Sequence, residues 1–169
     1  MTVFSVLAYG AGALSLATLA TFALPRSVEI TREAQIDAPP ETILALAASN
    51  AGYQRFNPYL TADPALKIRA FGPEQGVGSG FHFEGKDGKG SQTVAEVTAD
   101  TVRYFIDLGP MGQPEQSITA RPAAGGSHVT WRMQADLGMN PAARVMGLFM
   151  DRMLGDTFRQ GLSNLAAAI

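Results

Sequence analysis

Residues 80–87, Gly-Phe-His-Phe-Glu-Gly-Lys-Asp, place two glycines and a lysine at nearly the spacing of a phosphate-binding loop. Such a loop runs from a strand into a helix, because backbone N–H groups and the helix N-terminus hold the anion. Here aromatic and polar residues alternate between the glycines, which is the period of a strand. Asp87 stands where a magnesium-binding Ser or Thr is needed. We therefore predict a β-hairpin and no nucleotide site.

Few other residues could perform acid–base or metal chemistry. The chain has no cysteine and only two histidines, His82 and His128, which excludes thiol catalysis and leaves almost no room for a multi-histidine metal site. His82 is the best single candidate for proton transfer, since the ordinary pKa of histidine lies near neutrality. A solvated histidine on a sheet surface is the simpler interpretation. The acids Glu96, Asp107 and Asp136 show no paired spacing. The catalytic residues therefore stay unknown, and we expect no metal and no cofactor.

Length and charge narrow the function classes further. The 169 residues fit one domain with a small appendage. The net charge is −2 and 17% of the residues are charged. A nucleic-acid-binding protein usually presents a basic face. The composition therefore gives no support for a nucleic-acid partner.

The appendage is residues 1–25, which contain no charged side chain. About 20 apolar residues in a helix cross a hydrocarbon core of about 30 Å, so we favour a transmembrane anchor. A cleaved secretory signal is the alternative, with a small-residue cleavage site near Ala23, but its usual basic start is missing. A buried helix is a third possibility. Arg26 and Arg32 weakly favour a domain on the cytoplasmic side of the membrane. Cleavage would instead give a secreted or periplasmic domain.

Alternating apolar and polar residues predict strands through most of the remaining chain. Two short helices are expected in residues 38–49 and 53–60, separated by a break at residues 50–52. Seven strands are expected at residues 27–37, 65–72, 76–85, 91–100, 101–109, 115–123 and 127–138. Short turns between consecutive strands imply an antiparallel sheet.

A long amphipathic helix is predicted for residues 141–168. Asn140 is a good N-cap, and Pro141 suits the first helical position. One apolar stripe contains Met146, Phe149, Met150, Met153 and Thr157, and Leu154, Phe158, Leu162 and Leu165 continue it. The opposite face carries Arg144, Arg152, Arg159, Asp151 and Asp156. One long helix packed on an antiparallel sheet makes the fold class α+β, with room for a cavity between the two layers.

Several segments together resemble the polyketide cyclase/dehydrase and lipid-transport group of the START-like (SRPBCC, Bet v 1-like) superfamily. The resembling segments are residues 28–49, 57–66, 72–90 and 127–137 and the final helix. None of them is a catalytic motif. The resemblance implies a helix-grip fold for residues 27–169: a curved sheet of about seven antiparallel strands around the C-terminal helix, with an apolar cavity that commonly holds a hydrophobic small molecule.

One departure from the family pattern affects the ligand. Close members often have tryptophan in the segments that here contain Tyr53, Phe56, Tyr59, Phe81 and Phe83. The pocket shape can therefore differ, and the ligand cannot be carried over from the family.

Candidate cavity-lining residues follow from strand and helix faces. They are Phe81, Phe83, Tyr104, Trp131, Met133, Met146, Met150 and Met153. Each has a plainer structural interpretation as core. For Tyr104, the plainer interpretation is a hydroxyl that only satisfies a backbone partner. Methionine packs adaptably around varied ligands, which suits a deformable pocket.

These observations predict a membrane-anchored START-like domain that binds, transports or sequesters a hydrophobic small molecule or lipid. A polyketide cyclase/aromatase-like enzyme is the alternative, and it should place at least two polar side chains facing each other in the cavity. A third alternative is a structural or regulatory module whose cavity is filled by its own side chains. The predominance of apolar residues on the inner faces favours binding over chemistry.

Overall fold

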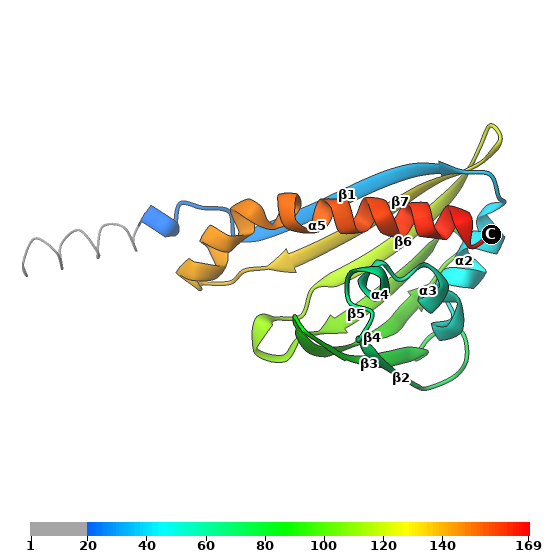
Figure 1. Ribbon diagram of the computed structural model, residues 1–169. Coiled ribbons are helices and arrows are strands. Elements are labelled where there is room, and N and C mark those ends of the chain that lie inside the picture. Colours follow the sequence, from blue (N-terminus) through cyan, green and yellow to red (C-terminus); the bar gives the residue numbers. More distant parts are fainter. Residues whose placement is uncertain (1–19) are drawn as a thin grey trace, which may run out of the picture.

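The computed structural model describes residues 20–169 as a sheet that curves around one long helix (Figure 1). The strands are β1 (Ser27–Ile36), β2 (Lys67–Phe71), β3 (Gly80–Gly85), β4 (Gly88–Val97), β5 (Thr101–Asp107), β6 (Glu115–Ala123) and β7 (Gly126–Asp136). The helices are α2 (Pro40–Ala47), α3 (Asn50–Phe56), α4 (Pro58–Ala62), the short 3₁₀ turn η1 (Gly109–Met111) and α5 (Pro141–Ala167). The predicted α+β class and the seven strands are confirmed.

All seven strands form one antiparallel sheet in the order β1-β7-β6-β5-β4-β3-β2. From β2 to β7 each strand pairs with the next along the chain, as short connections favour. Strands β2 and β1 are the two edges of the sheet. Strand β1 pairs with β7, from Ser27 opposite Asp136 to Ile36 opposite Ser127. The register shifts between Val94 and Glu96, a β-bulge that adds to the bending of the sheet.

Residues 80–87, which resemble a phosphate-binding loop in sequence, form part of a hairpin, as predicted. Gly80–Gly85 is β3, paired with β4 so that Gly85 lies opposite Gly88. Only Lys86 and Asp87 remain to form the turn. No helix follows, so the backbone offers no N-terminus to an anion.

The chain between β1 and β2 forms three short helices, and our prediction of two was wrong. Residues 50–52, expected to break a helix, instead start α3. The reason is a cap: the Ser49 hydroxyl accepts a hydrogen bond from the Gly52 N–H at 2.9 Å. Asn57 then accepts from the Tyr59 N–H, and Pro58 begins α4.

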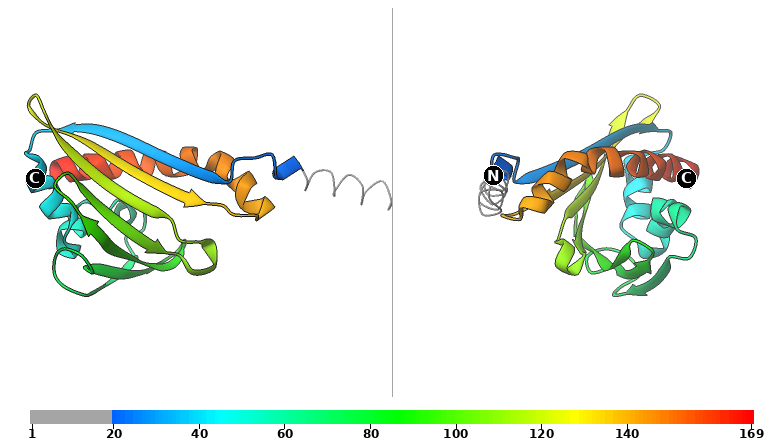
Figure 2. Two further views of the ribbon diagram at one scale, coloured as in Figure 1. Left: turned by 180° about the vertical axis from the view of Figure 1, so that it is seen from behind. Right: turned by 60° about the vertical axis from the view of Figure 1, so that its left-hand side comes forward.

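Helix α5 runs along the concave side of the sheet, and its bounds confirm the predicted helix to within a residue. The Asn140 side chain caps it by accepting from the N–H groups of Ala142 and Ala143 at 3.0 and 3.3 Å. Helices α2–α4 and the C-terminus lie at one end of the molecule (Figures 1 and 2). The start of the described chain and the first turns of α5 lie at the other.

Most of the predicted anchor, residues 1–25, lies outside the described residues. Within residues 20–169, none of the helices combines the length and the apolar character needed to cross a membrane. The long α5 is amphipathic and packs on the sheet.

Candidate functional site

The candidate site is the interior between the concave face of the sheet and the helices. Alternate residues of six strands point into this interior, so every second side chain of those strands is buried. The buried inward-facing residues include Ile30, Ile36, Phe81, Gln92, Val94, Val102, Tyr104, Ile106, Gln116, Ile118, Ala120, Val129, Trp131 and Met133. Most are apolar, and two are glutamines.

An aromatic cluster fills the end of this interior that α2 and α3 cover. Tyr53 of α3 lies at its centre, with ring centroids 4.8 Å from Phe56, 5.5 Å from Phe81 and Tyr104, and 6.2 Å from Trp131. The Trp131 ring also stacks on Phe158 of α5 at 5.3 Å. Large rings in contact explain why this end holds little free space.

Polar groups occur within this apolar surrounding. The Gln116 amide donates to the Tyr53 hydroxyl at 3.1 Å, and the Tyr104 hydroxyl donates to the Ala47 carbonyl at 2.9 Å. Gln92 is buried nearby. The indole N–H of Trp131 is buried without a hydrogen-bond partner among the described residues. A buried donor without an acceptor costs about 1–3 kcal/mol, so this N–H has unused capacity for a water or a ligand oxygen.

The free space within this cluster is about 10 Å³. That is room for about one water molecule. The lining residues are Ala47, Ser49, Asn50, Tyr53, Ser79, Gly80, Phe81, Gln92, Val94 and Tyr104. A ligand larger than water can therefore bind at this end of the interior only if the lining side chains move.

Burial controls the ionisation of both tyrosines. Desolvation raises the pKa of Tyr53, partly offset by hydrogen bonds from the side chains of Gln116 and Gln92. Burial, with a smaller contribution from Tyr53, raises the pKa of Tyr104 well above its ordinary value. Both hydroxyls are therefore neutral at physiological pH, and they can donate or accept hydrogen bonds but cannot act as bases.

We expect alkaline pH to destabilise the domain through these two hydroxyls and through that of Tyr59, because burial raises the pKa of Tyr59 to about 12. Above pH 10, the ordinary tyrosine pKa, the unfolded chain releases protons that the folded chain retains. The buried tyrosine hydroxyls therefore contribute their full share of the free energy of unfolding below about pH 10. Above it, the free energy of unfolding falls by about 1.4 kcal/mol per pH unit for each tyrosine, until the folded-state pKa is reached. Urea unfolding at a series of alkaline pH values measures the slope.

The control variants are Tyr104→Phe and Tyr53→Phe, each of which removes one of the three hydroxyls. Between pH 10 and 12 each is expected to reduce the slope by about a third, because the three contributions add. A slope unchanged in both variants would assign the alkaline loss of stability to other groups.

The structure places six of the eight predicted cavity residues against one another or against the same core, five of them on the sheet and Met150 on α5. Phe81, Tyr104, Trp131 and Met133 are buried on the concave face. Phe83 is partly buried and lies 6.3 Å from Phe81 between ring centroids. The plainer interpretation of Tyr104 is also correct, since its hydroxyl satisfies a backbone carbonyl.

The three methionines of α5 differ. Met150 packs partly buried against the core, but Met146 and Met153 are 53% and 60% exposed. The face of α5 that packs against the sheet differs from the one we predicted. The reason is that glycines of α5 lie against Arg32 and Trp131. A Cβ at Gly155 would overlap the Arg32 guanidinium, and a Cβ at Gly161 would overlap the Trp131 ring.

This difference also corrects the predicted polar face. Phe158, Leu162 and Leu165 face the core as expected, whereas Phe149 is 55% exposed. Arg144, expected on the polar face, is buried. Backbone carbonyls satisfy its guanidinium, which makes that burial possible.

The sequence analysis did not identify the two buried glutamines, and it did not predict that Tyr53 lies at the centre of the aromatic cluster. A signal was available for Gln116, which shares strand parity with Ile118 and Ala120 in the alternating segment 115–123. Gln92 has the same relation to Val94. A glutamine on an otherwise apolar face is informative because its burial requires a partner.

Neither histidine lies in the interior. His82 is exposed, with its ring 4.7 Å from that of Phe71, and His128 is exposed with Nε2 3.4 Å from a Glu33 carboxylate oxygen. Across residues 20–169, no cluster of three or more acidic or histidine side chains could hold a metal ion.

Comparison with known proteins identifies the family. The profile of the family described as polyketide cyclase/dehydrase and lipid transport matches residues 27–169. The chain belongs to this family. Its relatives by structure include SRPBCC and Bet v 1-like proteins, which agrees with the helix-grip architecture. No curated protein matches the chain.

Solved structures confirm the family fold at low sequence identity. KanY has 18% identity and a TM-score of 0.63, with 83% of this chain and 96% of that chain covered. CV1439 from Chromobacterium violaceum has 17% identity and a TM-score of 0.58, with 85% and 96% covered. The di-domain ARO/CYC protein StfQ of the steffimycin biosynthetic pathway has 11% identity and a TM-score of 0.61, with 83% and 50% covered. Similarity at these low sequence identities indicates a shared fold but does not indicate a shared activity.

Proposed function

We propose that this family member binds a hydrophobic small molecule or lipid between its sheet and α5, and that residues 1–25 tether it to a membrane. The observation that carries the binding proposal is the Trp131 indole N–H, which has no partner among the described residues and lies in a mostly apolar interior. Such a donor suits an apolar molecule with one carbonyl or hydroxyl oxygen. The family description, which includes lipid transport, agrees with this ligand class.

The ligand needs space that the end near α2 and α3 lacks. Towards the first turns of α5 the inward side chains are smaller or only partly buried: Ala135 of β7 and Met150 and Leu154 of α5. Methionine and leucine can change rotamer at modest cost, and Met150 is unbranched. We therefore place the apolar body of the ligand here, with its polar group directed towards Trp131.

The tether rests on sequence alone. Residues 1–25 are uncharged, and a stretch of this length can span a bilayer. We propose membrane localisation, with the cytoplasmic side weakly favoured by Arg26 and Arg32.

Native mass spectrometry of the full chain, extracted from its own membranes, tests the binding proposal. We expect a bound apolar species, and we expect Trp131→Phe to reduce its occupancy because that variant keeps an aromatic ring but removes the N–H donor. The matched control is Phe105→Leu, on the solvent side of β5. Protein that is consistently empty would contradict the proposal and would favour a module whose own side chains fill the interior.

A second candidate is a cyclase- or dehydrase-like enzyme. It is favoured by the polar side chains that face each other inside the domain, Gln116 and Tyr53 at 3.1 Å. Neutral tyrosine and amide groups could orient a reactive carbonyl, but they lack a base. A bound species that leaves chemically changed would favour this candidate.

A further inference from the structure

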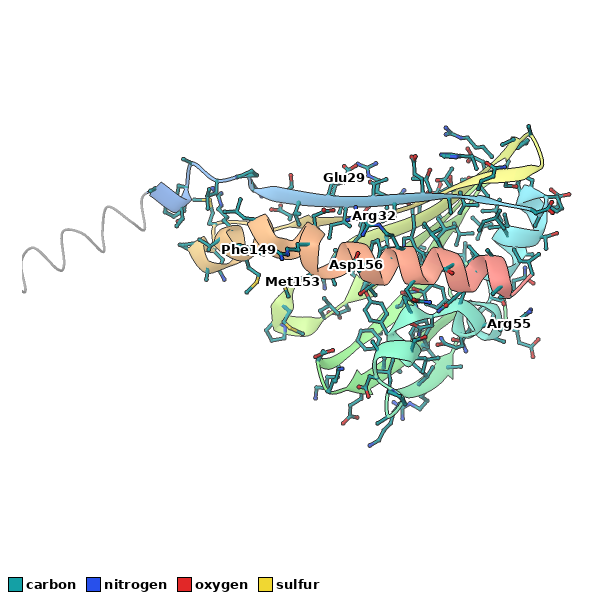
Figure 3. All side chains as sticks on the ribbon, turned by 45° about the horizontal axis from the view of Figure 1, so that its top comes forward. Glu29, Arg32, Arg55, Phe149, Met153 and Asp156 are labelled. Carbon is teal, nitrogen blue, oxygen red and sulfur yellow. The ribbon has the colours of Figure 1, made fainter. Side chains whose placement is uncertain are left out.

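The first turns of α5 present apolar side chains to solvent instead of to the sheet. Val145, Met146, Phe149 and Met153 are 41%, 53%, 55% and 60% exposed. Their spacing places them on one side of the helix. Met139, just before the helix, is 67% exposed. We call these five residues the α5 apolar stripe, and Figure 3 shows Phe149 and Met153 within it. A surface helix normally directs charged side chains outwards, so this arrangement needs a partner.

The stripe lies where the N-terminal segment joins the domain. Arg144, within the first turn of α5, donates from Nη1 to the carbonyl oxygens of Phe22 and Leu24 at 2.9 and 3.3 Å. Its guanidinium also lies 5.4 Å from the centroid of the Phe22 ring. Arg144 therefore holds the chain just before Arg26 against the start of α5. Residues 1–19, with their uncharged sequence, connect to the domain beside the stripe.

The charges around the stripe suit a lipid surface. Between residues 137 and 155 the only acidic side chain is Asp151, which is paired with Arg32 at 2.9 Å. Arg152 is exposed and forms no ion pair or hydrogen bond within the described part of the chain. Apolar side chains flanked by an unpaired arginine are typical of helices that lie at the headgroup boundary of anionic membranes.

A second copy of the chain is a weaker explanation. A two-fold interface across the stripe would bury Arg152 of both copies, two positive charges that need carboxylates to pair with them. The neighbouring carboxylate of Asp151 is already paired with Arg32 and is not available to both. A bilayer with anionic lipids supplies the missing negative charge.

We propose that the α5 apolar stripe inserts into the interfacial layer of the bilayer that the N-terminal segment enters. The proposal rests in part on the tether of the proposed function. Side chains of an interfacial helix reach about 5–10 Å into the headgroup and acyl boundary. The tether raises the local concentration of the stripe at the membrane, so a small apolar surface is sufficient. The stripe would then fix how the domain stands on the membrane.

The absence of cysteine from the chain allows single-cysteine labelling of the full-length protein. An environment-sensitive fluorophore is placed at Phe149→Cys or Met153→Cys, in vesicles of phosphatidylcholine and phosphatidylglycerol. Val97→Cys on β4 is the matched control, since Val97 is an apolar side chain of 42% exposure outside the stripe. Ala13→Cys reports on the N-terminal segment itself. Quenchers attached near the headgroup and deep in the acyl chain are compared with a quencher in water.

The stripe labels are expected to lose at least about half of their emission to the shallow lipid quencher, the depth at which interfacial side chains lie. The Val97 label should respond only to the aqueous quencher. Quenching at Ala13 without quenching at the stripe would overturn this proposal and leave the tether intact. No lipid quenching at Ala13 would overturn the tether. Disulfide-linked dimers through Phe149→Cys would identify a second copy as the partner instead.

Discussion

Replacing Trp131 by alanine is expected to lower the free energy of unfolding by about 3–5 kcal/mol, the usual cost of removing a buried tryptophan side chain. Trp131 is fully buried and contacts rings from two helices, Tyr53 and Phe56 of α3 and Phe158 of α5. Gly161 of α5 lies directly against the indole and has no side chain with which to fill the space that the truncation leaves. Urea unfolding followed by circular dichroism measures the loss.

The control for Trp131 is Phe105→Ala, an aromatic truncation on the solvent side of β5 where the side chain is 41% exposed. We expect a loss below about 1 kcal/mol there, because surface substitutions rarely exceed that range. A small loss at Trp131, combined with a large loss of ligand, would instead make this residue a cavity wall rather than a core residue.

Replacing Gly126 by alanine is the second large expected effect. Gly126 begins β7 with φ +128°, a backbone conformation that only glycine adopts readily. A Cβ there would also overlap the carbonyl oxygen of Ile36 and lie 2.8 Å from the Cα of Asp37. Strain of about 1–3 kcal/mol from φ and a similar amount from overpacking should add. Chemical denaturation measures the total, which should exceed that of any other single glycine in this turn.

Gly125→Ala is a matched control, because Gly125 has φ +76° and nothing within 4 Å of an added Cβ. It should cost only the conformational strain, about 1–2 kcal/mol. The difference between the two variants then reports the contact of β7 with the end of β1 together with the additional strain of φ +128°. Equal losses of free energy of unfolding in the two variants would show that the end of β1 can move to accommodate a Cβ at position 126.

The sequence by itself determined the fold class and the positions of most elements. Alternation of apolar and polar residues is a local property, so the seven strands could be assigned from it, as could the inward parity of Tyr104 and Trp131. The cap at Asn140 and the proline after it marked the start of α5 for the same reason. The first turn of α3 was not predicted. Gly52 indicated a helix break, and this signal outweighed that of Ser49 as an N-cap.

Only the tertiary structure decided which side of α5 meets the sheet. The apolar residues of α5 cover too much of its circumference for periodicity to choose one face, since both sides carry methionine or leucine. Close approach settles the choice: Gly155 and Gly161 allow Arg32 and Trp131 to reach the helix, so Phe158 turns inwards and Met146 and Met153 turn outwards. The free volume of about 10 Å³ beside Tyr53 was also decided by the tertiary structure. It depends on how side chains from distant segments interlock, which no local pattern encodes.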